Sequence, residues 1–273
     1  MATTSAIADP PAAEIFISVN DGDPKTDTIV GAPSQNGNQV YIASYAALDG
    51  SWLVTYNVSA DYTNNPQTAL IGTVTVENKT VRDTLSFRVG LDVPICPMVE
   101  RGSFVGGSAL LTLATNGPGT LSCVKEGTPI FRGTTDGHPV GSIFYCPTTL
   151  SSTGSSLISY SGTYGLPGVS LPGKPSFETI GMVEEFRLTA KDKLTMQFTL
   201  FFKDANGIAP PVPCEMDVDG DGIVGPIDLA EIFASWGTTS FCPSMLPTDF
   251  NDDGQVDAAD LMILLNAWGD CEG

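Results

Sequence analysis

Basic residues are scarce in this chain. Its 273 residues include 12 Lys and Arg against 31 Asp and Glu, which gives a formal charge of −19. From Cys214 to the end there are 13 acidic residues and no Lys or Arg, so this region alone carries −13. Such a surface repels phosphate backbones and anionic lipid, so we expect no nucleic-acid partner. No apolar run approaches the roughly 20 residues of a transmembrane helix, so no membrane span is expected.

Histidine and paired cysteine motifs are also lacking. The single histidine, His138, sits in the turn sequence Asp-Gly-His-Pro, and no two cysteines form a Cys-x-x-Cys pair, so a zinc finger is excluded. Disulfides are the better interpretation, with Cys123 and Cys146 a plausible pair, and they favour an oxidising compartment. The six cysteines are Cys96, Cys123, Cys146, Cys214, Cys242 and Cys271.

Residues 1–13 contain the small-residue pattern of a signal-peptide cleavage site. Ala6-Ile-Ala8 is followed by Asp9-Pro10, but the basic and apolar segments that normally precede such a site are missing. Two interpretations stay open, a signal-peptide remnant and an ordinary disordered tail. The cysteines and the acidic C-terminal loops favour export, so we predict a secreted protein, extracellular or attached to the cell surface.

Residues 14–203 have no helical periodicity. Segments rich in Val, Ile, Thr, Tyr and Phe alternate with clusters of Gly, Pro, Asn and Asp, a pattern typical of strands joined by turns. We predict an all-β antiparallel sandwich of jelly-roll or immunoglobulin-like type, whose last two strands form a hairpin across Lys191-Asp192. Residues 204–213 contain three prolines and are expected to form a linker. Strands are expected at 15–19, 40–45, 52–59, 70–77, 84–89, 109–114, 142–145, 157–160, 182–190 and 194–202.

Catalytic motifs are absent from the sandwich sequence, which has no Gly-x-Ser-x-Gly, His-Glu-x-x-His or Walker loop. Glu184 and Glu185 are adjacent on a strand and point to opposite faces, so they cannot serve as a glycosidase pair. We therefore expect a protein that is not an enzyme. Two converging carboxylates in one cleft would overturn this expectation.

Two further patterns in the sandwich bear on carbohydrate. Asn57-Val-Ser and Asn78-Lys-Thr match N-glycosylation sequons, although such short matches are weak. Four aromatic residues could supply a sugar-binding platform, although positions in the core or in cross-strand pairs are favoured for them. They are Trp52, Tyr41, Tyr45 and Tyr56.

The last sixty residues contain one pattern twice, at an offset of 32 residues. Segments 217–228 and 249–260 place oxygen-bearing side chains at positions 1, 3, 5 and 12, with glycine at position 6. Calcium takes six to eight oxygen ligands at about 2.3–2.6 Å, and position 6 must turn sharply. We therefore predict two calcium ions, with a backbone carbonyl from position 7 of each loop and a carboxylate from position 9 of the second. The predicted ligands are Asp217, Asp219, Asp221, Ile223 and Asp228, and then Asp249, Asn251, Asp253, Gln255, Asp257 and Asp260.

A helix is expected after each loop, and none before it because prolines precede both loops. Apolar residues recur at i, i+3, i+4 and i+7 from Leu229 and again from Leu261, and each pattern ends at a glycine suited to a left-handed cap. At core spacing, four large residues are expected inside the unit: Phe233, Trp236, Leu265 and Trp268.

A calcium loop followed by a helix, repeated twice without an entering helix, resembles the type I dockerin module of bacterial secreted proteins. The resemblance covers residues 214–273. It implies that Val224 and Val256, at position 8, pair the two loops as a short ribbon. It also implies a pseudo-twofold symmetry that brings Cys214 near Cys271 for a disulfide. If Cys123 pairs with Cys146, Cys96 and Cys242 are then either free or joined across the domains.

The resemblance also implies a partner. In dockerins the partner is a cohesin, contacted partly at loop positions 10 and 11, which are often Ser-Thr. Here these positions are Pro226-Ile227 and Ala258-Ala259, so we predict apolar contact with a cohesin-like or other surface receptor. The predicted function is calcium-dependent attachment. Two alternatives stay open: a self-assembling structural subunit of a surface layer or fibre, and a dockerin-tethered carbohydrate-active enzyme or carbohydrate-binding protein.

Overall fold

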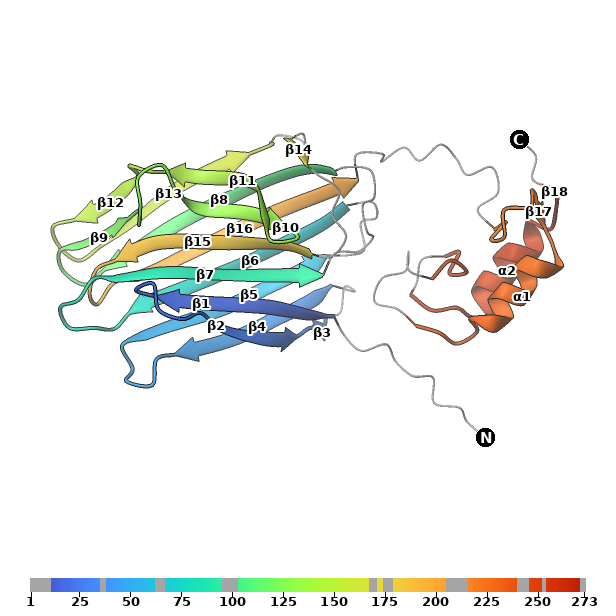
Figure 1. Cartoon of the computed structure of the whole chain (residues 1–273), viewed down its shortest axis with the longest axis horizontal. Coiled ribbons are helices and arrows are strands. Elements are labelled where there is room, and N and C mark those ends of the chain that lie inside the picture. Colours follow the sequence, from blue (N-terminus) through green and yellow to red (C-terminus); the bar gives the residue numbers. More distant parts are fainter. Residues whose placement is uncertain are drawn as a thin grey trace. The chain divides into compact units, whose positions relative to one another are not determined.

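The structure is a computed structural model that describes residues 11–34, 38–61, 67–94, 103–166, 171–173, 179–204, 216–239, 246–251 and 254–270. The chain divides into two compact units, with the sandwich in residues 11–205 and the smaller unit in residues 206–273. Figure 1 shows the strands of the first unit and the two helices of the second. Among the described residues, no helix is long and apolar enough to cross a membrane.

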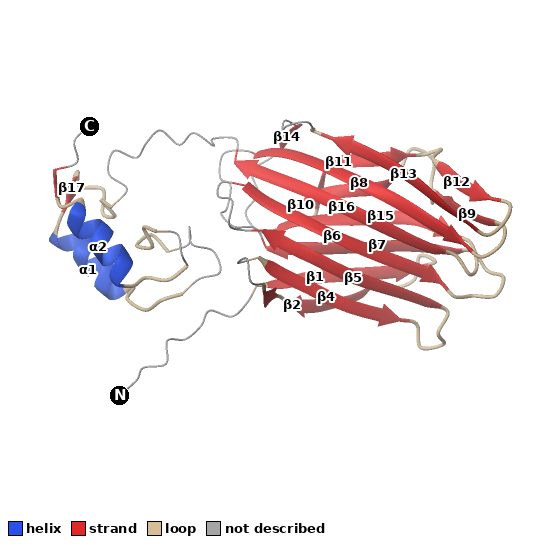
Figure 2. Ribbon diagram, turned by 180° about the vertical axis from the view of Figure 1, so that it is seen from behind, coloured by secondary structure: helices blue, strands red, loops and turns tan. Residues whose placement is uncertain are grey.

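The first unit consists of two antiparallel sheets packed face to face, which confirms the predicted sandwich (Figures 1 and 2). One sheet, here the first sheet, has the order β11-β10-β15-β7-β1-β2, with β9 beside β15 and β12 beside β9. Its strands are β1 (Ala12–Val19), β2 (Lys25–Val30), β7 (Leu85–Pro94), β9 (Gly119–Ser122), β10 (Pro129–Thr135), β11 (His138–Tyr145), β12 (Thr149–Ser152) and β15 (Thr179–Leu188).

The second sheet has the order β13-β8-β16-β6-β5-β4-β3, with β14 beside β8. Its strands lie side by side along the sandwich in Figure 2. They are β3 (Ala32–Pro33), β4 (Gln39–Ala46), β5 (Trp52–Asp61), β6 (Gln67–Asn78), β8 (Ser103–Thr115), β13 (Ser156–Tyr164), β14 (Leu171–Gly173) and β16 (Lys193–Asp204).

The core lies between the sheets and is built by strict alternation. In β16, Leu194, Met196 and Phe198 are buried, while the intervening Thr195 and Gln197 face outward. Aromatic rings connect the two sheets, since Phe131 of β10 packs on Phe198 with ring centroids 5.9 Å apart. Each fully buried side chain of this size contributes roughly 1.5–3 kcal/mol.

The predicted hairpin across Lys191-Asp192 is wrong. β15 belongs to the first sheet and β16 to the second, so the turn crosses from one sheet to the other. Asp192 is buried there, and its carboxylate accepts hydrogen bonds from the Thr189 hydroxyl and, at 3.3 Å, from the Asn116 backbone N–H. Alternation of apolar and polar residues identifies a strand but not the strand beside it. The sequence therefore wrongly predicted that β15 and β16 pair as a hairpin.

All ten predicted strands overlap observed ones, but β2, β3, β9, β10, β12 and β14 were not predicted. Most of the six are short. β10 was missed because it is almost entirely buried, so its sequence does not alternate between apolar and polar residues.

The aromatic platform does not form. Tyr41 and Tyr56 are fully buried, as the core interpretation requires, and Tyr45 packs edge-on against Tyr56 with centroids 6.3 Å apart. The sequon at Asn78 is also unsuited to modification, because Asn78 is buried and its amide donates to the carbonyl oxygens of Asp83 and Leu188, both at 2.8 Å. Asn57 is exposed on β5.

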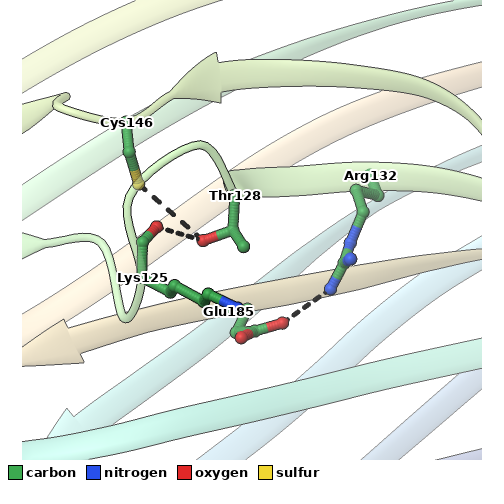
Figure 3. A network of polar contacts seen from close by, with 5 residues as sticks. All are labelled: Lys125, Thr128, Arg132, Cys146 and Glu185. Atoms are coloured by element: carbon green, nitrogen blue, oxygen red, sulfur yellow. Dashed lines mark hydrogen bonds and ion pairs between the residues drawn. The ribbon is translucent and has the colours of Figure 1, made fainter.

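Glu184 and Glu185 do point to opposite faces of β15. Glu185 lies on the outer face and accepts a hydrogen bond of 2.7 Å from the Arg132 guanidinium (Figure 3). Glu184 is fully buried in the core, and neither of its carboxyl oxygens has a hydrogen-bond partner in the part of the chain that the structure describes. Burial disfavours the charged form and raises the pKa of Glu184 well above its usual value.

One predicted disulfide is confirmed. Cys123, just after β9, is bonded to Cys146, just after β11. The Thr128 hydroxyl lies 3.8 Å from the Cys146 sulfur and donates to the Lys125 carbonyl, which holds the intervening loop (Figure 3). The other four cysteines lie outside the described residues, so the pairing of Cys214 with Cys271 stays a prediction.

Candidate metal centre

The first acidic loop brings three carboxylates together. Asp217, Asp219 and Asp221 each place an oxygen within 4.8 Å of the others. Backbone N–H groups fold the loop inward around them, because Gly222 donates to Asp217 at 2.8 Å and Ile223 donates to Asp221 at 2.8 Å. Gly222 has a φ of +89°, as position 6 of a calcium loop requires. The three side chains offer only carboxylate oxygen atoms as metal ligands, a set that suits calcium rather than zinc.

Asp228 closes the first loop from the helix that follows it. Its side chain is buried and accepts hydrogen bonds at 2.7 Å from the N–H groups of both Val218 and Gly225. Burial alone would raise the pKa of Asp228, but these donors and the Asp219 N–H outweigh it and hold the pKa below its usual value. Position 12 is therefore a fixed carboxylate in a loop that wraps around it.

The second loop repeats this geometry 32 residues later. Asp260 is fully buried and accepts from the N–H groups of Phe250 and Asp257, both at 2.8 Å, as Asp228 does from Val218 and Gly225. Asp249 accepts from Gly254 at 2.8 Å, and Gly254 has a φ of +84°. The two segments share five of their 12 residues, and they adopt one hydrogen-bonding scheme.

The remaining predicted ligands of the second loop make local contacts, and their role as calcium ligands stays a prediction. Asn251 donates its N–H to Asp260 at 3.3 Å. Gln255, at position 7, forms a β-bridge with Thr239. Asp257 accepts the Ala259 N–H at 2.7 Å and caps the following helix, a role that Gly225 has no side chain to fill. Asp253 lies outside the described residues.

The pKa of Asp219 in the first loop is raised above its usual value. The N–H of Asp221 lowers this pKa, but desolvation, repulsion from the charges of Asp221 and Asp228, and a hydrogen bond with the Asp217 side chain together raise it. A bound divalent cation would reverse this repulsion, since its charge exceeds every other charge at the site.

A nine-residue helix follows each loop, as predicted. They are α1 (Pro226–Ala234) and α2 (Ala258–Asn266), whose C-terminal cap residues are Ser235 and Ala267. The glycines expected as caps come two residues later, with φ of +75° at Gly237 and +130° at Gly269. They turn the chain back rather than ending the helices.

The expected ribbon between Val224 and Val256 is wrong, because each loop pairs instead with the segment that follows the other helix. β17 (Ile223–Val224) pairs with β18 (Gly269–Asp270). Correspondingly, Gly237 donates its N–H to the Val256 carbonyl at 2.8 Å, and Val256 donates to the Thr238 carbonyl at 3.0 Å. The exchange is reciprocal, so neither repeat completes its loop without the other.

The core of this unit is small. Val224, Ile232, Val256 and Leu264 are fully buried and equivalent in pairs between the repeats. The four large residues expected inside are instead exposed, with fractional exposures of 57, 44, 51 and 46 % for Phe233, Trp236, Leu265 and Trp268. Two short helices bury only a narrow stripe each, and residues beside that stripe stay at the surface despite their core-like spacing.

The predicted partner-binding residues are all at the surface. Pro226, Ile227, Ala258 and Ala259 form the exposed first turns of α1 and α2. With the four large residues they extend the apolar surface of the unit, to which Met262 also contributes at 65 % exposure. Phe233 and Trp236 pack on each other with ring centroids 5.9 Å apart.

Sequence reasoning did not find two acids on the outer face of the first sheet. Glu14 and Asp92 are cross-strand neighbours and, with Asp27, line a depression of about 460 Å³. Burial raises the pKa of Asp92, the charges of Glu14 and Asp136 add to this shift, and a 3.1 Å hydrogen bond from the Thr134 hydroxyl opposes it. Spacing in the sequence gave no signal because the two acids lie 78 residues apart.

No family model matches the chain, and no curated protein matches it. Two of the solved structures to which it is similar are carbohydrate-binding modules. One is TmCBM61 in complex with β-1,4-galactotriose, at 10 % identity and a TM-score of 0.27, covering 70 % of this chain and 88 % of the other. The second is a CBM4 structure, at 14 % identity and a TM-score of 0.21, covering 64 % and 90 %. Both likenesses are too loose for either structure's ligand to bear on this chain.

Proposed function

We propose that the C-terminal unit binds two calcium ions and attaches the β-sandwich to a partner in a calcium-dependent way. The observation that carries this proposal is the recurrence of one carboxylate-centred hydrogen-bonding scheme at an offset of 32 residues. A chance acidic turn would have no reason to bury the position-12 carboxylate twice, at Asp228 and Asp260, against equivalent N–H donors.

Coupling of the ions to folding follows from the size of the core. Four fully buried side chains, two from the loops and two from the helices, form the centre of the unit. Such a core is too small to offset the repulsion of 13 acidic residues without basic ones. Two calcium ions would reduce the charge of this region from −13 to −9, so their binding free energy becomes folding free energy.

The partner should combine a basic rim with an apolar centre. The unit stays negatively charged after calcium binding, and its exposed residues Phe233, Trp236 and Trp268 are of the type that dominates binding hot spots. This chemistry supports a cohesin-like or other surface receptor as the partner, which the protein is proposed to meet outside the cell. The sequence predicted that these aromatic residues lie inside the unit, but because they are exposed we include them in the proposed partner-binding surface.

Calorimetric titration of the full chain with calcium tests the proposal. We expect about two ions per chain, and Asp217→Ala should reduce the number to about one because the second loop is kept. Chelation should unfold the C-terminal unit and leave the sandwich folded. Glu231→Gln is the matched control, since it removes an exposed charge of α1 outside both loops. Absence of binding, or two sites retained in Asp217→Ala, would contradict the proposal.

The sandwich is proposed to be non-catalytic. Of the acids that could form a pair, Glu184 is sealed in the core and Glu185 is held by Arg132. Glu14 and Asp92 line one depression with Asp27, so Asp92 is the residue whose replacement tests the non-catalytic proposal. The structural-subunit alternative predicts calcium-dependent self-assembly, which light scattering of the calcium-loaded chain would reveal.

A further inference from the structure

The outer face of the second sheet presents an uncharged, hydroxyl-rich surface. Six strands of this sheet lie in the order β4-β5-β6-β16-β8-β13 (Figure 2). Their registers align three consecutive rows of outward positions. The first row reads Ser44, Thr55, Thr75, Thr195, Thr112, Ser159; the second Ile42, Asn57, Thr73, Gln197, Leu110, Ser161; the third Val40, Ser59, Ile71, Thr199, Ser108, Thr163. These 18 positions are called the hydroxyl face.

The composition of this face is unusual for the chain. Twelve of its positions carry hydroxyl groups, two carry amides, four are aliphatic and none is charged. Threonine on a wet strand face is ordinary, because β-branched residues favour strands. The lack of charged residues is unusual. Charged residues make up 16 % of the whole chain, so about three of 18 positions would be expected to be charged.

The other sheet gives the contrast within the same molecule. Its outer face carries Arg132 and Glu185 as an ion pair and Asp92 next to Glu14. On the second sheet, charged residues lie in the rows that flank the hydroxyl face: Lys193 pairs with Glu77 at 3.1 Å on one side, and Asp61 lies on the other. The charged residues thus stop at the border of the hydroxyl face.

The hydroxyl face is also hollowed. A depression of about 430 Å³ crosses four of its six strands, β6, β16, β8 and β13. Its outward-pointing floor is formed by Ile71, Thr73, Gln197, Thr199, Ser108, Leu110, Ser161 and Thr163. The trough runs across the strands, and each of its two rows has three polar side chains and one aliphatic side chain, Leu110 or Ile71.

We infer that the hydroxyl face binds a neutral polysaccharide, lying in the trough across β6, β16, β8 and β13. Hydroxyl and amide groups both donate and accept hydrogen bonds, so they match the hydroxyls of a sugar chain without fixed polarity. Ile71 and Leu110 offer apolar contact for the C–H faces of sugar rings. A neutral ligand approaches a chain of charge −19 without repulsion, whereas a sulfated or uronic acid polymer does not.

Protein partners fit this face poorly. Protein interfaces are enriched in aromatic residues, Met and Arg and depleted in Ser at their centres, and the 18 positions contain no aromatic residue, Met or Arg. Pairing of two copies through this face would bury twelve hydroxyl groups, each at a cost unless a partner is found. A sugar chain supplies such partners at every residue.

Affinity electrophoresis of the full chain tests the inference, with xylan, mannan, galactan and dextran as neutral probes and polygalacturonate and dextran sulfate as charged counterparts. The protein should be produced without N-glycosylation, because Asn57 lies on the face. We expect retardation by at least one neutral polymer and none by the charged ones. Thr199→Asp and Gln197→Glu should each weaken retardation at least tenfold, because each places a charge in the trough.

Thr26→Asp is the matched control, since Thr26 is exposed on β2 of the first sheet, and it should bind like the wild type. Gln197→Glu changes an exposed side chain by one atom, so its loss of binding cannot be ascribed to misfolding. Retardation should persist in chelator, which separates this site from calcium-dependent attachment. Lack of retardation by every neutral polymer, equal binding of Gln197→Glu and wild type, retardation by charged polymers alone, or a dimer that Thr199→Asp dissociates would each overturn the inference.

Discussion

Replacing Glu184 by glutamine should remove a pH dependence from the stability of the sandwich. The side chain is fully buried, neither oxygen has a partner, and burial raises its pKa well above the usual value. The folded state therefore keeps the proton where the unfolded state, with a carboxyl pKa of about 4.3, has lost it. Because the unfolded state then binds fewer protons, stability falls as pH rises through this window.

The magnitude follows from linkage. Above pH ~4.3, each pH unit should cost the wild type about 1.4 kcal/mol relative to Glu184→Gln, until the raised pKa of Glu184 is passed. Below pH ~4.3 the carboxyl is protonated in both states, and the two proteins should differ little. Asp92, whose pKa is also raised, contributes a slope of the same sign to both proteins, so the difference between them isolates Glu184.

Urea unfolding of the sandwich at pH 4, 5, 6 and 7, in saturating calcium, measures this difference. Glu185→Gln is the matched control, because Glu185 is the next residue but is part-exposed and paired with Arg132 at 2.7 Å. It should change stability by less than about 1 kcal/mol at each pH. Equal pH slopes in wild type and Glu184→Gln would refute the reasoning.

Three other outcomes are expected. Cys123→Ser should lower the stability of the sandwich by about 3 kcal/mol, since the disulfide joins residues 23 positions apart; an unchanged urea midpoint would contradict this. Ile227→Asp should weaken docking to an isolated partner about tenfold, and more than Ala259→Asp does, because Ile227 is the larger exposed side chain; calcium affinity should be kept in both variants, and equal losses would contradict a preference for the first turn of α1 over that of α2. Neither the wild type nor Asp92→Asn should release reducing sugar from a neutral polysaccharide, and release that Asp92→Asn abolishes would identify an enzyme.

Local patterns in the sequence predicted much of both units. Alternation in segments such as 194–202 is confirmed in β16, because the period of a strand is written in consecutive residues. The acidic loops were predictable for the same reason, since the side chains gathered in the first loop lie within 12 residues. Asp217, Asp219 and Asp221 come together as their spacing indicates.

Sheet membership was not predictable, and this is why the hairpin prediction failed. The turn at 191–192 has the composition of a tight connection, but whether the next strand pairs or crosses depends on which neighbours compete for its edges. β6 and β8 flank β16, and β7, β9 and β10 flank β15, all of them remote in sequence. The hydroxyl face has the same origin, because its rows exist only in the register of six strands.

In the C-terminal unit, the sequence determined the two loops, their glycine turns and the helices after them, because each of these elements depends on residues close together in the sequence. The tertiary structure decided that each loop pairs with the segment beyond the other helix, and that Trp236 and Trp268 stay at the surface. Helical spacing specifies the side of a helix that faces inward. How deeply that side is buried depends on how many side chains from the rest of the unit pack against it, and two nine-residue helices supply few.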